Sequence, residues 1–190
     1  MKNLIKISAF IGILSCMGFA QAVEESAPAA DSSAPAADSS APAADGSAPA
    51  TKFELFSDAW MKAFMEEWNK ETEALVDKLA KLDNPFTANI AYGFYGEDKP
   101  KGVLIVEKGK ATGAGSYNDE TLKWDLRAKP GSWEKWLKAG KIGKLDMAKP
   151  ARWGGLGFEK GNYSAMMKDP SMMGPFLKSF EVMSRVPTKW

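Results

Sequence analysis

The stretch LKWDLRAKPGSWEKWLKAG (residues 122–140) contains the two patterns that decide the fold. In its first third, large apolar side chains occupy every second position from 122 to 126, with charged residues between them. This is the period of a strand with one buried face. We therefore expect the side chain of Trp124 to be buried and those of Lys123 and Asp125 to be exposed.

The rest of this stretch predicts a short helix. Trp133, Trp136 and Leu137 follow one another at helical spacing. Ser132 can cap the N-terminus, and Gly140 stands where a left-handed residue commonly ends a helix. A strand that leads directly into an amphipathic helix indicates that the helix packs on the sheet.

Residues 51–85 predict one long amphipathic helix, or two in tandem. Thr51 and Glu54 have the spacing of a capping box, and Asp83-Asn84-Pro85 ends the segment. Between these limits the large apolar side chains recur every three or four residues: Phe53, Phe56, Trp60, Phe64, Trp68, Leu75, Val76 and Leu79.

Two more strands are expected at residues 90–95 and 103–106, separated by a polar turn. Short turns between successive strands favour antiparallel pairing. The pattern Gly109-x-x-x-Gly113-x-Gly115 is interpreted as turn glycines. It lacks the Gly-Lys-Ser/Thr of a phosphate loop and does not precede a helix.

The last third predicts a second short helix with Ile142, Leu145 and Met147, then a strand at residues 156–160. A closing helix begins near Asp169-Pro170, and it contains Met172, Met173, Phe176, Leu177, Phe180 and Met183 at helical spacing. We therefore expect an α+β fold, with an antiparallel-rich sheet of about five strands and helices packed over one face.

The chain has no histidine and a single cysteine. Histidine is the usual general base and a common metal ligand, so its absence excludes Ser-His-Asp chemistry, Cys-His chemistry and most zinc sites. Four acids could supply paired carboxylates, but they lie in turn-rich polar stretches typical of solvated loops: Glu97, Asp98, Asp119 and Glu120. The sequence therefore favours a binding protein over an enzyme, without a cofactor.

Residues 1–22 have the pattern of a secretory signal peptide. Lys2 and Lys6 precede an apolar run at residues 7–19 that is too short to span a bilayer, and Ala20-Gln21-Ala22 is a small-x-small cleavage site. The sequence around Cys16 resembles the lipobox of bacterial lipoproteins, so lipidation at Cys16 is an alternative. Either route predicts a periplasmic or secreted protein, and the second anchors it to a membrane.

Residues 23–50 repeat Ser-Ala-Pro-Ala-Ala-Asp and predict a disordered linker, because proline recurs and there is no large apolar side chain to bury. Residues 51–190 have the size of one domain. They carry 23 bases and 19 acids, an excess of four positive charges. This modest, interspersed excess does not indicate a nucleic-acid partner, but it permits weak attraction to an anionic membrane surface.

Three segments resemble the sterol-carrier-protein family, which has the non-specific lipid-transfer fold. Trp133-x-x-Trp136-Leu137-x-x-Gly140 is similar to the family's aromatic helix. LGFEKGN (residues 156–162) is similar to its strand ending in Gly-Asn or Gly-Asp, and residues 176–183 are similar to its closing helix. The resemblance covers residues 68–186 and departs from the family in the export signal.

The resemblance implies an apolar tunnel between the sheet and the helices. Such a tunnel would bind a hydrophobic lipid such as a sterol, fatty acid or isoprenoid, with transfer as a further role. Methionine suits such a site because its unbranched side chain can repack around ligands of different shape. The lipid-binding residues expected on this basis are Trp133, Trp136, Leu137, Met166, Met167, Met172, Met173, Phe176, Leu177 and Phe180. The substitution Met173→Glu is accordingly expected to abolish lipid uptake.

Three alternatives stay open at this point. Each of these side chains can equally be an ordinary core residue. The paired methionines offer thioether ligands for Cu(I), although adjacent helical residues point about 100° apart and chelate poorly. A Cu(I) titration against a competing chelator tests that alternative. The domain can also be an accessory module that presents a substrate to a lipid-processing enzyme.

Overall fold

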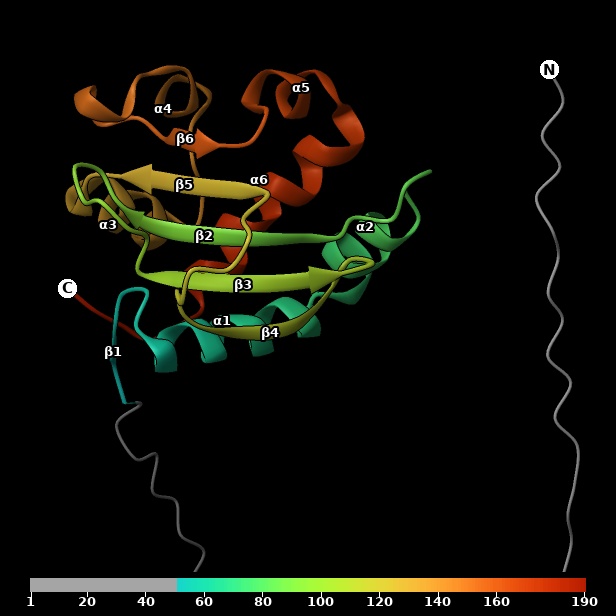
Figure 1. Cartoon of the computed structure of the whole chain (residues 1–190), viewed down its shortest axis with the longest axis horizontal. Coiled ribbons are helices and arrows are strands. Elements are labelled where there is room, and N and C mark those ends of the chain that lie inside the picture. Colours follow the sequence, from blue (N-terminus) through green and yellow to red (C-terminus); the bar gives the residue numbers. More distant parts are fainter. Residues whose placement is uncertain (1–50) are drawn as a thin grey trace, which may run out of the picture. The chain divides into compact units, whose positions relative to one another are not determined.

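The structure is a computed structural model that describes residues 51–190. The expected signal peptide (1–22) and linker (23–50) lie outside the described residues. A five-stranded sheet with the order β4-β3-β2-β5-β6 forms the centre of the fold, as Figure 1 shows. Its strands are β2 (Ala88–Phe94), β3 (Gly102–Glu107), β4 (Lys110–Ser116), β5 (Trp124–Ala128) and β6 (Gly157–Lys160).

Three of the four strand pairs are antiparallel, and the pair β2–β5 is parallel. The expectation of an antiparallel-rich, five-stranded α+β fold is therefore confirmed. The expectation that successive strands all pair antiparallel is wrong, because residues 117–123 cross from β4 over β3 and β2 to reach β5 (Figure 1). This crossing places Trp124 opposite Ile90 in a parallel register.

The interpretation of three glycines as turn residues is correct for only one of them. Gly109 does lie in a turn, with φ of 85°, but Gly113 and Gly115 belong to β4. A Cβ atom on Gly115 would lie 2.8 Å from the carboxylate of Asp58, the first residue of helix α1 (Asp58–Lys70). Glycine is needed there because β4 runs close against that helix.

Three helical elements occupy the segment of residues 51–85, where one long helix or two in tandem were expected. They are α1 (Asp58–Lys70), the π-helical segment η1 (Thr72–Val76) and α2 (Asp77–Ala80). The expected capping box at Thr51 and Glu54 is wrong, because Ser57 caps α1 by accepting a hydrogen bond from the Trp60 amide. Strand β1 (Phe53–Glu54) instead pairs in parallel with β7 (Thr188–Lys189).

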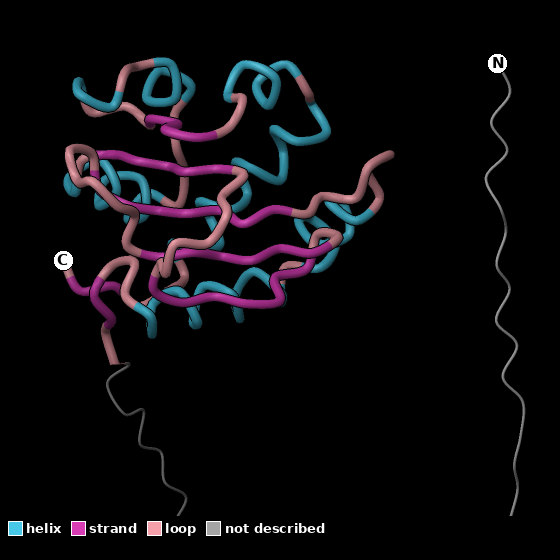
Figure 2. Tube along the Cα trace, in the orientation of Figure 1, coloured by secondary structure: helices cyan, strands magenta, loops and turns pink. Residues whose placement is uncertain are grey.

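The remaining helices are α3 (Pro130–Ala139), α4 (Lys144–Ala148), the 3₁₀ segment η2 (Ala151–Trp153), α5 (Tyr163–Lys168) and α6 (Pro170–Ser184). Gly140 ends α3 in the left-handed region as predicted, with φ of 62°. Ser132 does not cap α3, since the helix starts at Pro130, and its hydroxyl donates to the Gly154 carbonyl. Figure 2 shows α1, α3 and α6 on one face of the sheet, where the apolar core lies.

Strand β5 has the register that the alternation of residues 122–126 predicted. Trp124 faces the helices, half-buried, with its ring centroid 5.1 Å from that of Phe86, and Lys123 is exposed. The expectation that Asp125 is exposed is wrong: it is 6 % exposed and forms an ion pair with Arg127, which is 3 % exposed. The turn after β2 folds over the face of the sheet that bears Asp125 and Arg127. Arg127 also donates a hydrogen bond to the Glu97 carbonyl in that turn.

We expect removal of residues 1–50 to leave the unfolding midpoint of the rest unchanged within error. The repeat has no side chain suited to a core. The hydrogen bond from the Phe53 amide to the carbonyl of residue 187 is kept in the shorter chain. Thermal unfolding of the full chain and of a chain beginning at Thr51 checks this. A midpoint several degrees lower for the shorter chain would contradict it.

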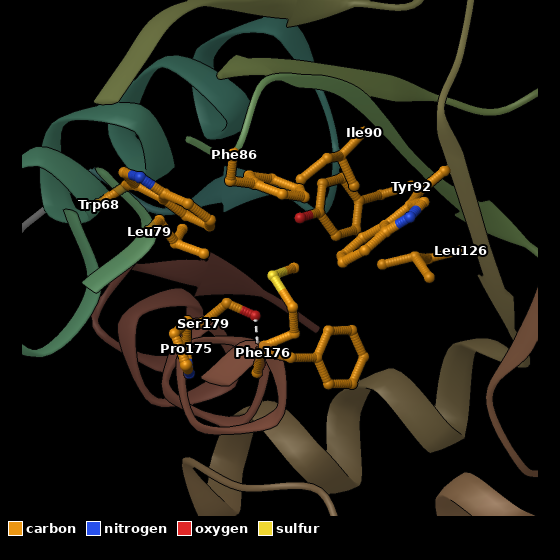
Figure 3. Close-up of a pocket in the computed structure, with 11 residues that line it drawn as sticks. Trp68, Leu79, Phe86, Ile90, Tyr92, Leu126, Pro175, Phe176 and Ser179 are labelled. Carbon is orange, nitrogen blue, oxygen red and sulfur yellow. Dashed lines mark hydrogen bonds between the residues drawn. The ribbon is translucent and has the colours of Figure 1, made fainter. Parts of the chain in front are cut away.

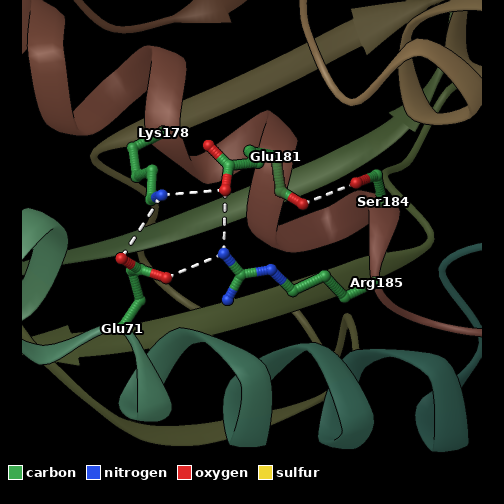
Figure 4. Close-up of polar contacts among 5 residues, drawn as sticks. All are labelled: Glu71, Lys178, Glu181, Ser184 and Arg185. Carbon is green, nitrogen blue, oxygen red and sulfur yellow. Dashed lines mark hydrogen bonds and ion pairs between the residues drawn. The ribbon is translucent and has the colours of Figure 1, made fainter.

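An ionic cluster joins the end of α1 to α6, as Figure 4 shows. Glu71 lies between the two cations, 2.8 Å from Arg185 and 3.3 Å from Lys178, and Glu181 lies 2.8 Å from each of them. Hydrogen bonds from Arg185 and Lys178 lower the pKa of Glu71, although its partial burial opposes the shift. The cluster fixes α6 against the π-helical segment.

We expect Glu71→Gln to lower the free energy of unfolding by about 1 kcal/mol at neutral pH, the scale of a partly exposed ion pair. A lowered pKa stabilises the fold above the unfolded value near 4.5, and this contribution is lost as the pH falls below it. The difference between the two proteins should therefore vanish at acid pH in denaturant titrations. Glu73→Gln, at an exposed site nearby, is the control, and an equal loss there would contradict the assignment.

Candidate functional site

An apolar pocket lies between the sheet and α6 (Figure 3). Its free volume is about 20 Å³, enough for a single water molecule. None of the described residues that line it carries a charge at neutral pH. They are Trp68, Leu79, Phe86, Ile90, Tyr92, Trp124, Leu126, Met172, Pro175, Phe176 and Ser179.

The periodicity of three elements aims side chains into this pocket. Alternate residues of β2 and β5 point to the same face, which brings Tyr92 and Leu126 opposite each other in the parallel register. On α6, Met172, Phe176 and Ser179 are spaced by four and three residues and so share one helical face. The pocket is therefore a continuation of the core rather than a separate cleft.

The polar atoms of the pocket differ in how they are satisfied. The Ser179 hydroxyl donates to the Phe176 carbonyl at 2.7 Å, and the Trp68 indole donates to the Gly109 carbonyl at 3.0 Å. The Tyr92 hydroxyl points into the pocket beside Phe86, as Figure 3 shows. Burial raises the pKa of Tyr92, so its hydroxyl stays protonated.

An open groove of about 490 Å³ adjoins the pocket. Phe86, Trp124 and Met172 line both spaces and form the boundary between them. Helix α5 contributes Ala165 and Met166 to the groove. Six of the thirteen residues that line it are polar: Asp83, Asn84, Lys123, Asn162, Asp169 and Ser171. An apolar interior that meets a polar rim suits an amphipathic molecule.

Comparison with solved structures identifies the fold. The chain superposes on the crystal structure of sterol carrier protein 2 with a TM-score of 0.54 and 21 % sequence identity, over 70 % of this chain and 99 % of that one. The fold is that of the sterol carrier proteins. A conserved hypothetical protein of Thermus thermophilus, described as a candidate sterol carrier protein, matches with a TM-score of 0.54 and 20 % identity, over 73 % of this chain and 94 % of that one. No family profile and no curated protein sequence matches the chain.

Within this sterol-carrier fold, three of the sequence-predicted site residues lie at the two spaces. Met172 and Phe176 line the pocket, and Met166 lines the groove together with Met172. Met167, Met173 and Leu177 are half-buried against the core, and none of them lines the pocket or the groove. A pocket of 20 Å³ is also much smaller than the tunnel that the resemblance implied.

The four other predicted residues are placed in the core. Trp133 and Trp136 are fully buried, and their indoles donate to the Gly93 carbonyl at 3.0 Å and the Asp146 carboxylate at 3.1 Å. Phe180 packs against both of these rings, and Leu137 lies near the C-terminal residues. Their strict helical spacing reflects packing against the sheet rather than contact with the pocket.

Sequence reasoning missed nine lining residues. Trp124 and Leu126 share one face of a predicted strand, and Ile90 and Tyr92 belong to the strand expected at residues 90–95. A search for the strand residues opposite the closing helix would have found all four. Trp68 and Leu79 belonged to the predicted apolar stripe. Phe86, Pro175 and Ser179 carry no periodic signal of their own.

The described residues were compared with the ligand sets that metal ions require. Within residues 51–190, no group of three or more Cys, Asp or Glu side chains is arranged to hold one. The four methionines considered for Cu(I) do not line one common space, since only Met166 and Met172 border the groove. None of the helices in this part of the chain is long and apolar enough to cross a membrane.

Proposed function

We propose that residues 51–190 bind a hydrophobic lipid without catalysing a reaction. The observation that carries this proposal is the apolar pocket between the sheet and α6, which adjoins a partly polar groove. The fold supports it, since a protein of the same fold is named a sterol carrier. The lipid occupies the pocket, and the adjoining groove is its route of entry.

Binding requires the pocket to widen, because 20 Å³ cannot hold an acyl chain or a sterol ring. Met172 is half-buried at the boundary of pocket and groove, so it can swing outward with little loss of packing. Each methylene buried contributes about 0.8 kcal/mol. A long chain therefore offsets the cost of displacing Met172 and shifting Phe176.

Native mass spectrometry of the full chain purified from its own host tests the proposal. We expect a species with one lipid bound, whose mass is recovered in the solvent extract. A protein that carries no lipid, and that takes none up from a total lipid extract of the host, would overturn the proposal.

We also place this activity in the bacterial cell envelope, as a periplasmic or secreted protein or a lipoprotein anchored through Cys16. The signal-like sequence of residues 1–22 supports this placement. Transfer between membranes and presentation of the lipid to a partner enzyme both fit a tethered carrier. Fractionation of host cells with an antibody against the domain tests the location, and cytoplasmic protein of unprocessed mass would contradict it.

We propose, further, that the segment of residues 129–154 contacts an anionic membrane surface. It contains seven basic and two acidic residues, a net charge of +5, whereas the rest of the described chain sums to −1. Leu145 is 76 % exposed and Trp153 is 68 % exposed. Exposed apolar side chains within a basic segment are typical of proteins that lie on the interface of a bilayer.

Sedimentation with vesicles tests this contact. The double substitution Leu145→Ala/Trp153→Ala is expected to weaken binding to phosphatidylglycerol vesicles by about tenfold, the scale of losing part of two buried side chains. Tyr95→Ala, at an exposed aromatic residue outside the segment, is the control. Equal binding of the double variant, or equal affinity for neutral phosphatidylcholine vesicles, would contradict the proposal.

A further inference from the structure

Tyr92 is buried, but its hydroxyl makes no hydrogen bond to any residue within 51–190. The residue is 2 % exposed, and its hydroxyl points into the free space of the pocket (Figure 3). Every fully enclosed side-chain oxygen and nitrogen of the described residues is paired, so this oxygen, which makes no hydrogen bond to them, is one that borders free space. Buried polar groups normally have a partner, so an exception at a pocket points to a ligand or a bound water.

The ring of Tyr92 is held firmly by its neighbours. It stacks on Phe56 at 5.7 Å between centroids, and the edges of Phe64 and Trp133 approach it at 5.9 Å and 6.3 Å. Its backbone lies in the middle of β2, between β3 and β5. The hydroxyl therefore has a fixed position, which is the condition for selecting a ligand by one hydrogen bond.

The residues around the Tyr92 hydroxyl determine which polar group of a ligand can bind to it. None of the described lining residues is charged, so an ionised carboxylate placed there would lose its hydration without a counter-charge. Because burial raises the pKa of Tyr92, the hydroxyl remains a hydrogen-bond donor. An uncharged oxygen, from a hydroxyl or a carbonyl group, meets both conditions.

We propose that the Tyr92 hydroxyl donates a hydrogen bond to an uncharged oxygen of the bound lipid. The site then prefers a neutral oxygenated lipid to a hydrocarbon and to an ionised fatty acid. This inference rests on the proposed lipid-binding function and specifies its ligand class. Without lipid, a single water fits the 20 Å³ beside the hydroxyl, and the ligand oxygen replaces it.

Ser179 allows the site to distinguish a lipid hydroxyl from a lipid carbonyl. Its hydroxyl proton is used on the Phe176 carbonyl, which leaves the Ser179 oxygen free to accept. A lipid hydroxyl can donate as well as accept, whereas a carbonyl can only accept. An alcohol that reaches both groups is therefore held more tightly than the corresponding ketone.

Calorimetric titration of the full chain with four probes of equal chain length tests the inference: an alkane, a primary alcohol, a methyl ketone and a fatty acid. We expect the alcohol to bind about tenfold more tightly than the alkane, the usual scale of one hydrogen bond. In Tyr92→Phe this preference should disappear while the affinity for the alkane is unchanged. Tyr163→Phe, at a half-buried tyrosine that does not line the pocket, should keep the preference.

Two results would overturn the inference while leaving lipid binding intact. One is an alcohol preference that persists in Tyr92→Phe, and the other is an equal change in affinity for all four probes. Either would show that the hydroxyl is paired only with water. A wild-type chain that binds none of the four probes would instead overturn the proposed function itself.

Discussion

Replacing Met172 with glutamate is expected to reduce lipid uptake by at least about tenfold without unfolding the protein. Met172 borders both the pocket and the groove, so a carboxylate there lies where the apolar chain has to enter. An ionised group held against an apolar ligand loses hydration, and this cost opposes binding. Uptake of a fluorescent long-chain alcohol measures the effect.

Met173→Glu is the matched control, since Met173 is the neighbouring half-buried methionine and lines neither the pocket nor the groove. The sequence alone predicted that Met173→Glu would abolish lipid uptake. Because Met172 and not Met173 lines the pocket and the groove, we now expect that effect from Met172→Glu. Circular dichroism should show native helix content in both variants. If Met173→Glu lost uptake and Met172→Glu retained it, the lipid would lie on another face of α6.

Replacing Arg127 with methionine is expected to lower the free energy of unfolding by about 3–5 kcal/mol, because it leaves the buried carboxylate of Asp125 without its partner. The pair is held by two hydrogen bonds, one of them 3.0 Å from the Arg127 Nη2 to an Asp125 oxygen. Arg127 also donates to the carbonyls of Phe94 and Glu97. Urea unfolding measures the loss.

Two further variants make this prediction specific. Lys99→Met removes one partner of an exposed, solvent-screened ion pair with Asp119 and should leave the free energy of unfolding unchanged within error. The double substitution Asp125→Leu/Arg127→Met should recover most of the stability, since a buried pair can often be replaced by apolar residues. A single variant as stable as the wild type would show that the pair is not desolvated.

The elements that the sequence predicted well are those whose periodicity reflects burial on one face. The strand with Trp124 and Leu126 and the helix with Trp133 and Trp136 were both predicted, because packing against one core imposes a regular period. Strand β4 was missed because its glycines, required by close contact with α1, carry no apolar alternation. The Asp125–Arg127 pair was missed because the turn that covers it is distant in sequence.

The site was harder to predict than the fold. Met172 and Phe176 were predicted because they belong to the apolar face of α6, but that face also includes Phe180, which lies in the core. Whether a residue fills the core or borders a space depends on which side chains oppose it across the sheet. Tyr92 shows this most clearly: the sequence indicates only a strand residue, and the structure shows that its hydroxyl points into the pocket and has no partner among the described residues.

In the proposed function, an apolar chain enters the space between the sheet and α6. Titration of the full chain with primary alcohols of increasing length tests it most directly. The dissociation constant should fall by roughly fourfold for each added methylene, equivalent to about 0.8 kcal/mol, until the widened pocket is filled. A dissociation constant that does not depend on chain length would contradict the claim.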